Sequence, residues 1–232
     1  MPQHVRSIFL VRHGRTSYNA AHRLQGQVDI PLDAVGQWQV KQTALALKDL
    51  YVDRRPQVSR QLIVCSDLGR ARATAQAFAD VLGGAELHPD PGVRERSFGE
   101  WDGHAVDELA ERYPEDFKLW VDHKDGEMKY GAEAKSAVGE RGVAAINDWS
   151  TSAGDDTDLY IFSHGAWISQ TLQTLLGLDR VDPAFASVLS MNNAHWVRLL
   201  PMDTADGGLR WRLMDYNHGP AIADTDEWER ER

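Results

Sequence analysis

Four short runs of consecutive apolar residues constrain the fold of this 232-residue chain more than any other feature of its sequence. They are rich in β-branched and aromatic side chains, which favours strands, and they lie at 8–11, 62–65, 159–162 and 196–200. Strands that are apolar on both faces predict a sheet that is covered on both sides. Helical periodicity fills the intervals, over 36–50, 70–82, 105–112, 133–149 and 166–176. Because strands and helices alternate, the sequence predicts an α/β fold.

The chain length suits one domain over 1–232 that carries a single insertion. The stretch 104–131 is polar, rich in aromatic residues and free of strand-like runs, so we expect it to form a helical cap over one end of the sheet. Its residues Tyr113, Phe117 and Trp120 have helical spacing, which favours a face packed on the core; a hydrophobic lid over the substrate is the alternative. The segment 224–232 has mixed charge and few apolar anchors, which predicts a flexible tail.

The overall charge limits the partners of this chain. A formal net charge of −10 argues against nucleic acid or an anionic membrane as the main partner, because both require a basic face. No apolar run is long enough to span a membrane, and the first seven residues lack a signal-peptide core, so we expect a cytoplasmic protein. The single cysteine, Cys65, cannot form an internal disulfide, which agrees with a reducing compartment. The sequence makes no prediction about oligomeric state.

Three of the four apolar runs end in polar residues suited to binding an anion. The first continues into RHGRTSYN, the second into CSDLGRARATA and the third into SHG. In open α/β sheets, ligands bind beyond the carboxyl ends of the strands, so these loops are expected to meet at one cleft. We interpret the glycine after each histidine as letting the backbone approach a ligand with its N–H free. The pattern predicts that His13 and His164 face one anion, together with Arg12 and either Arg70 or Arg72.

The same motifs, in this order, resemble those of the histidine phosphatase superfamily, the phosphoglycerate mutase-like fold. The resemblance covers nearly the whole chain and rests on LVRHGRTSYN, RLQGQVDIPLDAVG, SDLGRARATA, VRERSFGEWDG and SHG. It implies a three-layer α/β/α sandwich with a mostly parallel central sheet, helices on both faces and the insertion over the active site.

The resemblance also implies the roles of individual residues. It makes His13 the nucleophile that becomes phosphorylated and Glu95 the proton donor, with Glu100 and Asp102 as nearby alternatives. Four side chains are implied to hold the phosphate: Arg12, Arg70, His164 and Asn19. Four further residues are implied to contact the substrate: Thr16, Gln25, Gly26 and Gly165. Arg70 is preferred to Arg72 because Arg72 falls in a variable position of the motif, although Arg70 has the alternatives of pairing with Asp67 or capping a helix.

These residue types suit phosphoryl transfer. The migrating group spreads negative charge over its equatorial oxygens, which fixed cationic donors stabilise. A neutral imidazole is a competent nucleophile near pH 7, and a phosphohistidine divides the reaction into two easier steps. A carboxyl group such as Glu95 can protonate the leaving oxygen and later take a proton from water. We expect no metal and no cofactor, because arginine and histidine neutralise the phosphate and the sequence lacks a zinc motif.

Other reactive side chains fit less well. A cysteine phosphatase needs five residues between its thiolate and an arginine, whereas Cys65 has four before Arg70 and six before Arg72. We therefore interpret Cys65 as an inert strand thiol. The remaining histidines are expected on the surface or in the core, with an approach of His195 to the cleft left open; they are His4, His22, His88, His104, His123, His195 and His218.

The sequence favours hydrolysis of a small phosphorylated metabolite. A mutase must hold a second anionic group, and no dedicated basic site stands out in the insertion. The loop RLQGQVDIPL resembles the phosphatase branch, and ERSFGEW lacks the mutase sequence ERHYG. Mutase-type phosphoryl transfer is the alternative. A non-catalytic phosphate-binding relative is a second one, although such a relative normally lacks a motif member and none is missing here.

Two positions depart from the family pattern. Ala134 stands where many relatives have serine, which predicts either a lost helix cap or altered substrate contacts. Asp67 stands where relatives have proline, and we expect it to cap the helix that begins near Gly69 rather than to point toward the phosphate.

Overall fold

A mixed six-stranded sheet forms the centre of the computed structural model, which describes residues 4–55, 60–181, 187–205 and 208–231. The strands lie in the order β3-β2-β4-β1-β5-β6. Their bounds are β1 Ser7–Arg12, β2 Arg60–Cys65, β3 Leu87–Pro89, β4 Thr157–Ser163, β5 Trp196–Asp203 and β6 Leu209–His218. The first four strands along the chain are parallel to one another, and β5 and β6 are antiparallel additions. The expected mostly parallel sheet is confirmed.

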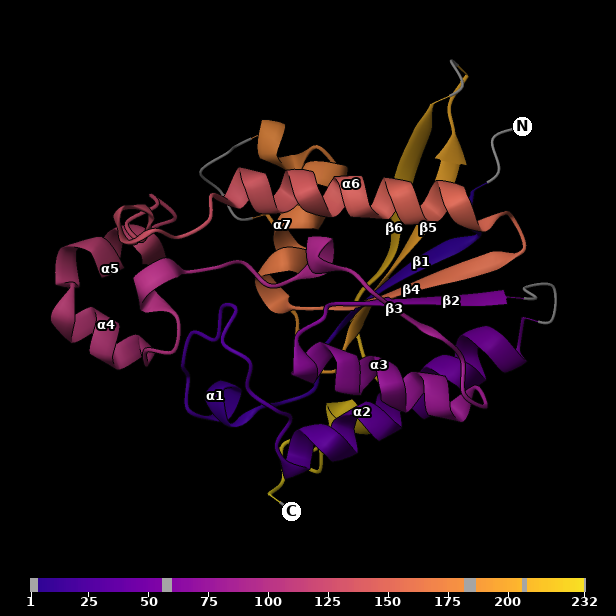
Figure 1. Cartoon of the computed structure of the whole chain (residues 1–232), viewed down its shortest axis with the longest axis horizontal. Helices are drawn as coiled ribbons and strands as arrows, with labels where there is room; N and C mark the ends of the chain where they lie inside the picture. Colours follow the sequence, from indigo (N-terminus) through magenta and orange to yellow (C-terminus); the bar gives the residue numbers. More distant parts are fainter. Residues whose placement is uncertain (1–3, 56–59, 182–186, 206–207, 232) are drawn as a thin grey trace.

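Helices cover both faces of this sheet (Figure 1). Helices α2 (Ala34–Leu47) and α3 (Gly69–Val81) lie on one face, and α6 (Lys135–Ala153) and α7 (Gly165–Leu175) lie on the other. Strand β1 shows why the apolar runs are continuous: alternate residues enter two separate clusters of buried side chains, with Ile8 and Leu10 in one and Phe9 and Val11 in the other. Both faces of the strand are therefore core, as the sequence predicted for the three-layer α/β/α fold.

The register of the parallel strands aligns their carboxyl ends. Arg12 at the end of β1 pairs with Ser163 at the end of β4, and Cys65 at the end of β2 pairs with Phe162. The loops that follow these three strands therefore start at one edge of the sheet. This alignment brings sequence motifs that are about 150 residues apart to the same place.

The five predicted helices and four predicted strands are all present, with ends shifted by a few residues. Two strands were not predicted: β3, which has three residues, and β6, whose charged residues interrupt its apolar pattern. A short helix α1 (Ser17–Ala20) was not predicted either, and α2 continues as a π-helical turn over Lys48–Asp53.

The segment 104–131 contains helices α4 (Val106–Arg112) and α5 (Pro114–Val121). Figure 1 shows both set apart from the sheet, beyond the end from which α7 starts. They pack on Trp101, whose ring centre lies 5.9 Å from the ring centre of Tyr113 and 6.0 Å from that of Trp120. Tyr113, Phe117 and Trp120 thus join a small aromatic cluster of their own rather than the main core.

The segment that follows β6 differs from the expected flexible tail. Trp228 is 4% exposed and its ring centre lies 5.5 Å from that of Trp38. Its carbonyl oxygen accepts a hydrogen bond from Gln39 Nε2 at 3.2 Å, and Glu231 pairs with Arg15 at 2.7 Å. One tryptophan buries a large apolar area, so counting few apolar residues underestimated this anchor. Residue 232 lies outside the described residues.

Candidate active site

The ends of β1 and β4 place two imidazoles next to each other, as the strand-His-Gly pattern predicted. The ring centres of His13 and His164 are 5.2 Å apart, with an angle of 61° between the rings. His13 is 2% exposed and His164 is fully buried. The backbone N–H of His13 donates to Ser163 at 3.0 Å, so the pairing of the two strands continues into the site.

The His13 ring has a defined orientation and charge. Its Nδ1 donates to the carbonyl oxygen of Gly14 at 2.7 Å, which leaves the Nε2 lone pair free of a proton. Arg70 Nε donates toward this Nε2 at 3.3 Å. Burial, followed by the charges of Arg70 and Arg12, lowers the pKa of His13 well below its usual value, so the ring is neutral at pH 7. A neutral imidazole with an unprotonated Nε2 is the form that can attack phosphorus.

Arg70, the second residue of α3, is fully buried. Its two terminal nitrogens donate to the carbonyl oxygens of Val28 and Gly26, each at 2.8 Å, and these bonds aim its Nε at His13. The choice of Arg70 over Arg72 agrees with this geometry, since Arg72 is exposed. Neither alternative for Arg70, pairing with Asp67 or capping a helix, occurs.

The prediction that Asp67 caps α3 is wrong. Asp67 forms an ion pair with Arg94, with one oxygen 2.6 Å from its Nε, and so points away from His13. The first residue of α3, Gly69, instead donates its N–H to Asp29 at 2.8 Å. The separation in sequence between these two residues explains why local pattern could not identify the cap.

Arg12 and His164 carry polar nitrogens that are buried without a protein partner among the described residues, namely Arg12 Nε and both ring nitrogens of His164. Arg12 Nη1 donates to the carbonyl oxygen of Met191. Burial and the nearby charge of Arg70 lower the pKa of His164 well below its usual value. Buried polar groups in native proteins almost always have partners, so these nitrogens indicate a polar ligand. We call the group of Arg12, His13, Arg70 and His164 the cationic end of the site.

Glu95 lies beside the cationic end and is 9% exposed. Its carboxylate accepts hydrogen bonds from the N–H groups of Ala166 and Trp167, at 3.2 and 2.9 Å, in the first turn of α7. Of the three carboxylates considered from the sequence, Glu95 lines the cavity. Asp102 is occupied by the N–H groups of Phe98 and Gln27, and Glu100 is exposed.

The polar residues around His13 form a connected network. Asn19 Oδ1 accepts from the N–H of Thr16 at 3.1 Å and from Asn193 Nδ2 at 3.2 Å, which leaves the amide nitrogen of Asn19 to donate into the cavity. Thr16 Oγ1 donates to Gln25 Oε1 at 3.0 Å, and Gly26 holds Arg70 through its carbonyl oxygen. Asn19, Gln25 and Gly26 line the cavity, whereas Thr16 is buried behind them.

The two glycines that follow the histidines have different roles. A Cβ on Gly165 would lie 3.3 Å from Arg12 Cζ and 2.7 Å from Ser190 Oγ, so this glycine makes room for the Arg12 guanidinium. A Cβ on Gly14 would lie 2.6 Å from Val40 Cγ1 in α2, and the Gly14 N–H donates to Thr74 at 3.2 Å. The interpretation that the N–H of Gly14 is kept free for a ligand is therefore wrong; helix packing requires this glycine.

The sequence analysis missed two sets of supporting residues. Asn193, in the loop before β5, donates to the His13 carbonyl oxygen at 3.0 Å; the polar run ahead of the fourth apolar strand was its only signal. Arg141 in α6 donates to the carbonyl oxygens of Gly92, Arg94 and Glu95, which fixes the loop that carries Glu95. His195 does not line the cavity; its backbone oxygen accepts from the Arg12 N–H at 2.9 Å, and its Nδ1 donates to the Asn193 carbonyl oxygen at 3.0 Å.

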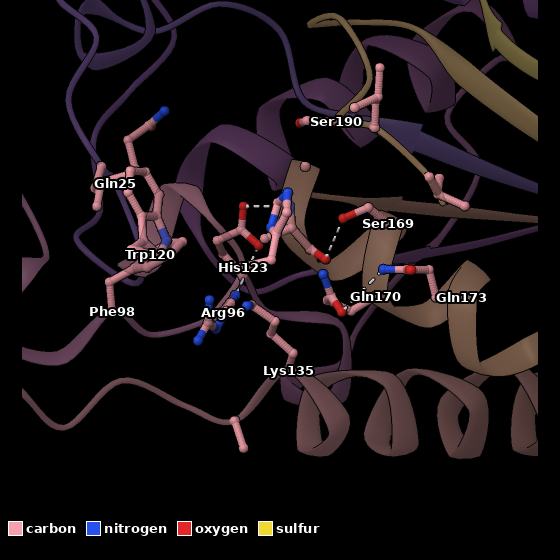
Figure 2. Close-up of a pocket in the computed structure, with 18 of the residues that line it drawn as sticks. Gln25, Arg96, Phe98, Trp120, His123, Lys135, Ser169, Gln170, Gln173 and Ser190 are labelled. Carbon is pink, nitrogen blue, oxygen red and sulfur yellow. Dashed lines mark hydrogen bonds between the residues drawn. The ribbon is translucent and has the colours of Figure 1, made fainter. Parts of the chain in front are cut away.

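A cavity of about 670 Å³ extends from the cationic end toward α5, α6 and α7. Figure 2 shows Phe98 and Trp120 on one side of it, Gln170 and Gln173 on the other, and Lys135 pointing in from the start of α6. We call these five residues the outer end of the site. Ala134 also lines it and is the N-cap residue of α6, where it provides no side-chain hydrogen bond, so its position is compatible with both predictions, a lost helix cap and altered substrate contacts.

Burial raises the pKa of the Cys65 thiol to about 11, which agrees with an inert strand cysteine. The described ranges contain no cluster of three or more histidine, cysteine, aspartate or glutamate residues suited to a metal ion. They also contain no helix with the length and apolar character needed to cross a membrane.

The comparisons with known proteins agree with this geometry. A model of the histidine phosphatase superfamily (branch 1) matches residues 8–215. A glucosyl-3-phosphoglycerate phosphatase of Mycolicibacterium vanbaalenii is 33% identical, covering 94% of this chain and 97% of its own length. A probable phosphoglycerate mutase of Serratia proteamaculans is 36% identical over 77% of each chain.

Two solved structures have the same fold. The mycobacterial glucosyl-3-phosphoglycerate phosphatase in a complex with VO3 has a TM-score of 0.75 and 27% identity, covering 91% of this chain and 98% of that one. Phosphoserine phosphatase from Entamoeba histolytica in complex with 3-phosphoglyceric acid has a TM-score of 0.72 and 25% identity, covering 96% and 98%. The fold and the paired imidazoles define a phosphoryl-transfer enzyme with phosphatase relatives. The chain belongs to the histidine phosphatase superfamily.

Proposed function

We propose that this enzyme hydrolyses phosphomonoesters of small metabolites through a covalent phosphate on Nε2 of His13. The observation that carries the proposal is the cationic end itself. A neutral imidazole, fixed in one tautomer by Gly14, lies beside buried nitrogens of Arg12 and His164 that have no other partner in the described chain. A phosphate oxygen is the kind of ligand that such donors bind.

The first half of the reaction forms the bond between phosphorus and His13 Nε2 and breaks the bond between phosphorus and the leaving oxygen. Arg12, Arg70 and His164 stabilise the charge on the equatorial oxygens, and Asn19 adds a neutral donor. Glu95 gives its proton to the leaving oxygen. In the second half a water attacks phosphorus, Glu95 takes the proton of that water, and the bond to Nε2 breaks to restore neutral His13. No step requires a metal ion.

Hydrolysis is favoured by the names of relatives that cover nearly the whole chain, which are phosphatases acting on glucosyl-3-phosphoglycerate and phosphoserine. Phosphoglycerate mutase activity is the second candidate, because a probable mutase is 36% identical. The two separate when 3-phosphoglycerate is incubated with and without a bisphosphoglycerate primer. Free phosphate as the main product supports the phosphatase, and predominant isomerisation contradicts it.

The direct test is hydrolysis of p-nitrophenyl phosphate by the full chain in the presence of EDTA. The expected result is activity that resists EDTA, is lost in His13→Ala and is retained in His104→Ala, a variant of a half-exposed histidine that does not line the cavity. Brief incubation with radiolabelled substrate should leave acid-labile label on the wild type and on His104→Ala but not on His13→Ala. Activity that survives His13→Ala, or that requires a metal, contradicts the proposal.

A further inference from the structure

Among the described residues, every lysine and arginine side chain that lines the cavity away from Arg12 has an acidic partner. Three cationic side chains line the cavity away from Arg12, and each has an acidic partner: Arg23 with Glu108 at 3.4 Å, Arg96 with Glu127 at 2.6 Å, and Lys135 with Asp125 at 2.7 Å. Among the described residues, the outer end is therefore polar without excess positive charge.

One wall of the outer end is a row of neutral hydrogen-bonding groups on α7. Ser169, Gln170, Gln173 and Thr174 share a helix face and line the cavity. Gln170 Oε1 accepts from Gln173 Nε2 at 3.4 Å, a bond that Figure 2 draws, so the amide nitrogen of Gln170 is left as a donor. Ser169 donates to the Ala166 carbonyl oxygen at 3.1 Å and keeps its lone pairs as acceptors. This wall can exchange hydrogen bonds with hydroxyl groups.

The facing wall is aromatic. Phe98 and Trp120 lie together across the cavity from Gln170 (Figure 2). Trp120 is held in place by Phe117 at 5.4 Å and by Trp101 at 6.0 Å between ring centres. An aromatic ring offers a large apolar surface with low loss of conformational freedom. It suits the C–H face of a ring whose hydroxyls are directed to the opposite wall.

The loop over residues 123–126 forms the third side of the outer end and carries one partner of an ion pair. His123 and Asp125 both have left-handed backbone conformations, with φ of 59° and 57°, which non-glycine residues seldom adopt. A Cβ on the next residue, Gly126, would lie 2.0 Å from the Asp116 carbonyl oxygen, so the loop has little freedom. The conformation directs Asp125 to Lys135, and this pair presents both a donor and an acceptor.

We propose that the leaving group of the substrate is a neutral polyhydroxylated group, a sugar or a polyol, that binds between Trp120 and Gln170. This proposal rests on the proposed phosphatase function and names its substrate class. The aromatic wall covers the C–H face, and the amide and hydroxyl row binds the hydroxyls. A carboxylate or second phosphate on the leaving group would have to compete with Glu108, Glu127 or Asp125 for a cation at the outer end. The cavity, of about 670 Å³, has room for a group of hexose size.

The experiment compares kcat/KM for four phosphomonoesters: sorbitol 6-phosphate, n-hexyl phosphate, 3-phosphoglycerate and p-nitrophenyl phosphate. The first three have alkyl leaving groups and differ in hydroxyls and charge, and the last is a reference ester whose leaving group carries no hydroxyl for the outer end to bind. The expected wild-type result is a preference for sorbitol 6-phosphate of at least about tenfold over n-hexyl phosphate and 3-phosphoglycerate. A preference for 3-phosphoglycerate, or equal use of all three, would overturn the inference.

Two variants test which residue produces the preference for sorbitol 6-phosphate. Gln170→Leu is expected to lower the ratio of kcat/KM for sorbitol 6-phosphate to kcat/KM for p-nitrophenyl phosphate by about 10–100-fold, because it removes a group that binds hydroxyls. Gln76→Leu, a matched change of an exposed glutamine on α3, should not alter this ratio. A uniform loss in Gln170→Leu contradicts the assignment of this residue. Hydrolysis of p-nitrophenyl phosphate that requires a metal, or that persists in His13→Ala, would contradict the proposed phosphatase function. Absence of a preference for sorbitol 6-phosphate, with that hydrolysis still dependent on His13, would contradict only the proposed leaving group.

Discussion

The two ends of one cavity are built in different ways. Arg70 and His164, at the cationic end, are fully buried and come from strand ends or the first turn of a helix on the sheet. At the outer end, α5 has no fully buried residue, and the side chain of Asp125 is 56% exposed. The sheet therefore fixes the groups that would act on phosphorus, while the cap presents groups that can change without disturbing the core. The difference predicts that substitutions at the cationic end affect every substrate and those at the outer end affect some.

A buried ion pair joins the two ends. Arg96 follows Glu95 directly and is 3% exposed, and Glu127 of the cap segment is fully buried. Arg96 donates to Glu127 at 2.6 Å and to the Glu133 carbonyl oxygen at 2.7 Å, so the position of Glu95 depends in part on the cap. Breaking this pair tests whether the ends are independent.

The largest effect is expected at the cationic end. Arg70→Met removes a fixed cation from the equatorial oxygens and should lower kcat/KM by about 10³-fold for every phosphomonoester, measured by steady-state phosphate release. Arg72→Met, two residues away and exposed, is the matched control and should retain wild-type activity. A loss that depended strongly on the leaving group would contradict the division between the two ends.

Glu95→Gln is expected to separate substrates by leaving group. Loss of the proton donor should lower kcat for alkyl phosphates by about 10²-fold, because an alkoxide is a poor leaving group without a proton. p-Nitrophenyl phosphate should lose much less, since its phenoxide departs readily. The test measures kcat of the wild type and of Glu95→Gln with both ester types from pH 5 to 8. Equal losses for the two ester types would assign Glu95 to phosphate binding or to a structural role.

Glu127→Gln is expected to weaken the connection between the ends. Removing one partner of a buried pair leaves an uncompensated Arg96 charge and should cost about 3 kcal/mol in the free energy of unfolding, measured with urea. The double variant Arg96→Met with Glu127→Leu should recover much of that stability. If the double variant also keeps full activity on alkyl phosphates, the pair does not position Glu95.

The smallest effect is a pH dependence of stability that belongs to the cationic end. The pKa of His164 in the folded chain is well below its usual value of about 6.5, so below pH 6.5 the unfolded chain binds a proton that the folded chain does not. The free energy of unfolding should therefore fall as pH drops below 6.5, by up to about 1.4 kcal/mol per pH unit for this group.

Asp158 acts in the opposite direction, because burial raises its folded pKa to about 6 and its protonation below that pH favours the folded chain. His13 adds to the slope of His164, since its pKa is lowered in the same way. Urea unfolding at pH 7, 6 and 5.5 should show a shallower fall in His164→Asn than in the wild type. Gln170→Leu, at the outer end, should keep the wild-type slope; an unchanged slope in His164→Asn would contradict the buried neutral imidazole.

The sequence predicted the cationic end better than the outer end. It predicted the α/β class, the strand ends and the proximity of His13 and His164, because apolar runs and the polar residues that follow them are local signals, and the sheet then aligns the strand ends. The requirement for glycine at position 14 could not be predicted from the sequence, since it depends on how closely α2 packs against this residue. The cap of α3 by Asp29 and the support from Asn193 also escaped prediction, because each joins segments far apart in the chain. The pairing of Lys135 with Asp125, which determines the charge of the outer end, is of the same kind.

The anchoring of Trp228 links the nucleophile loop to a residue more than two hundred positions later in the chain. Gln39 joins the two, since its Oε1 accepts from the Arg15 N–H and its Nε2 donates to the Trp228 carbonyl oxygen. During synthesis the loop after His13 leaves the ribosome early, but it lacks this hydrogen-bonded support until residue 228 has emerged. A nascent chain should therefore gain its full catalytic geometry only after residue 228 has emerged, long after its strand β1 has been made.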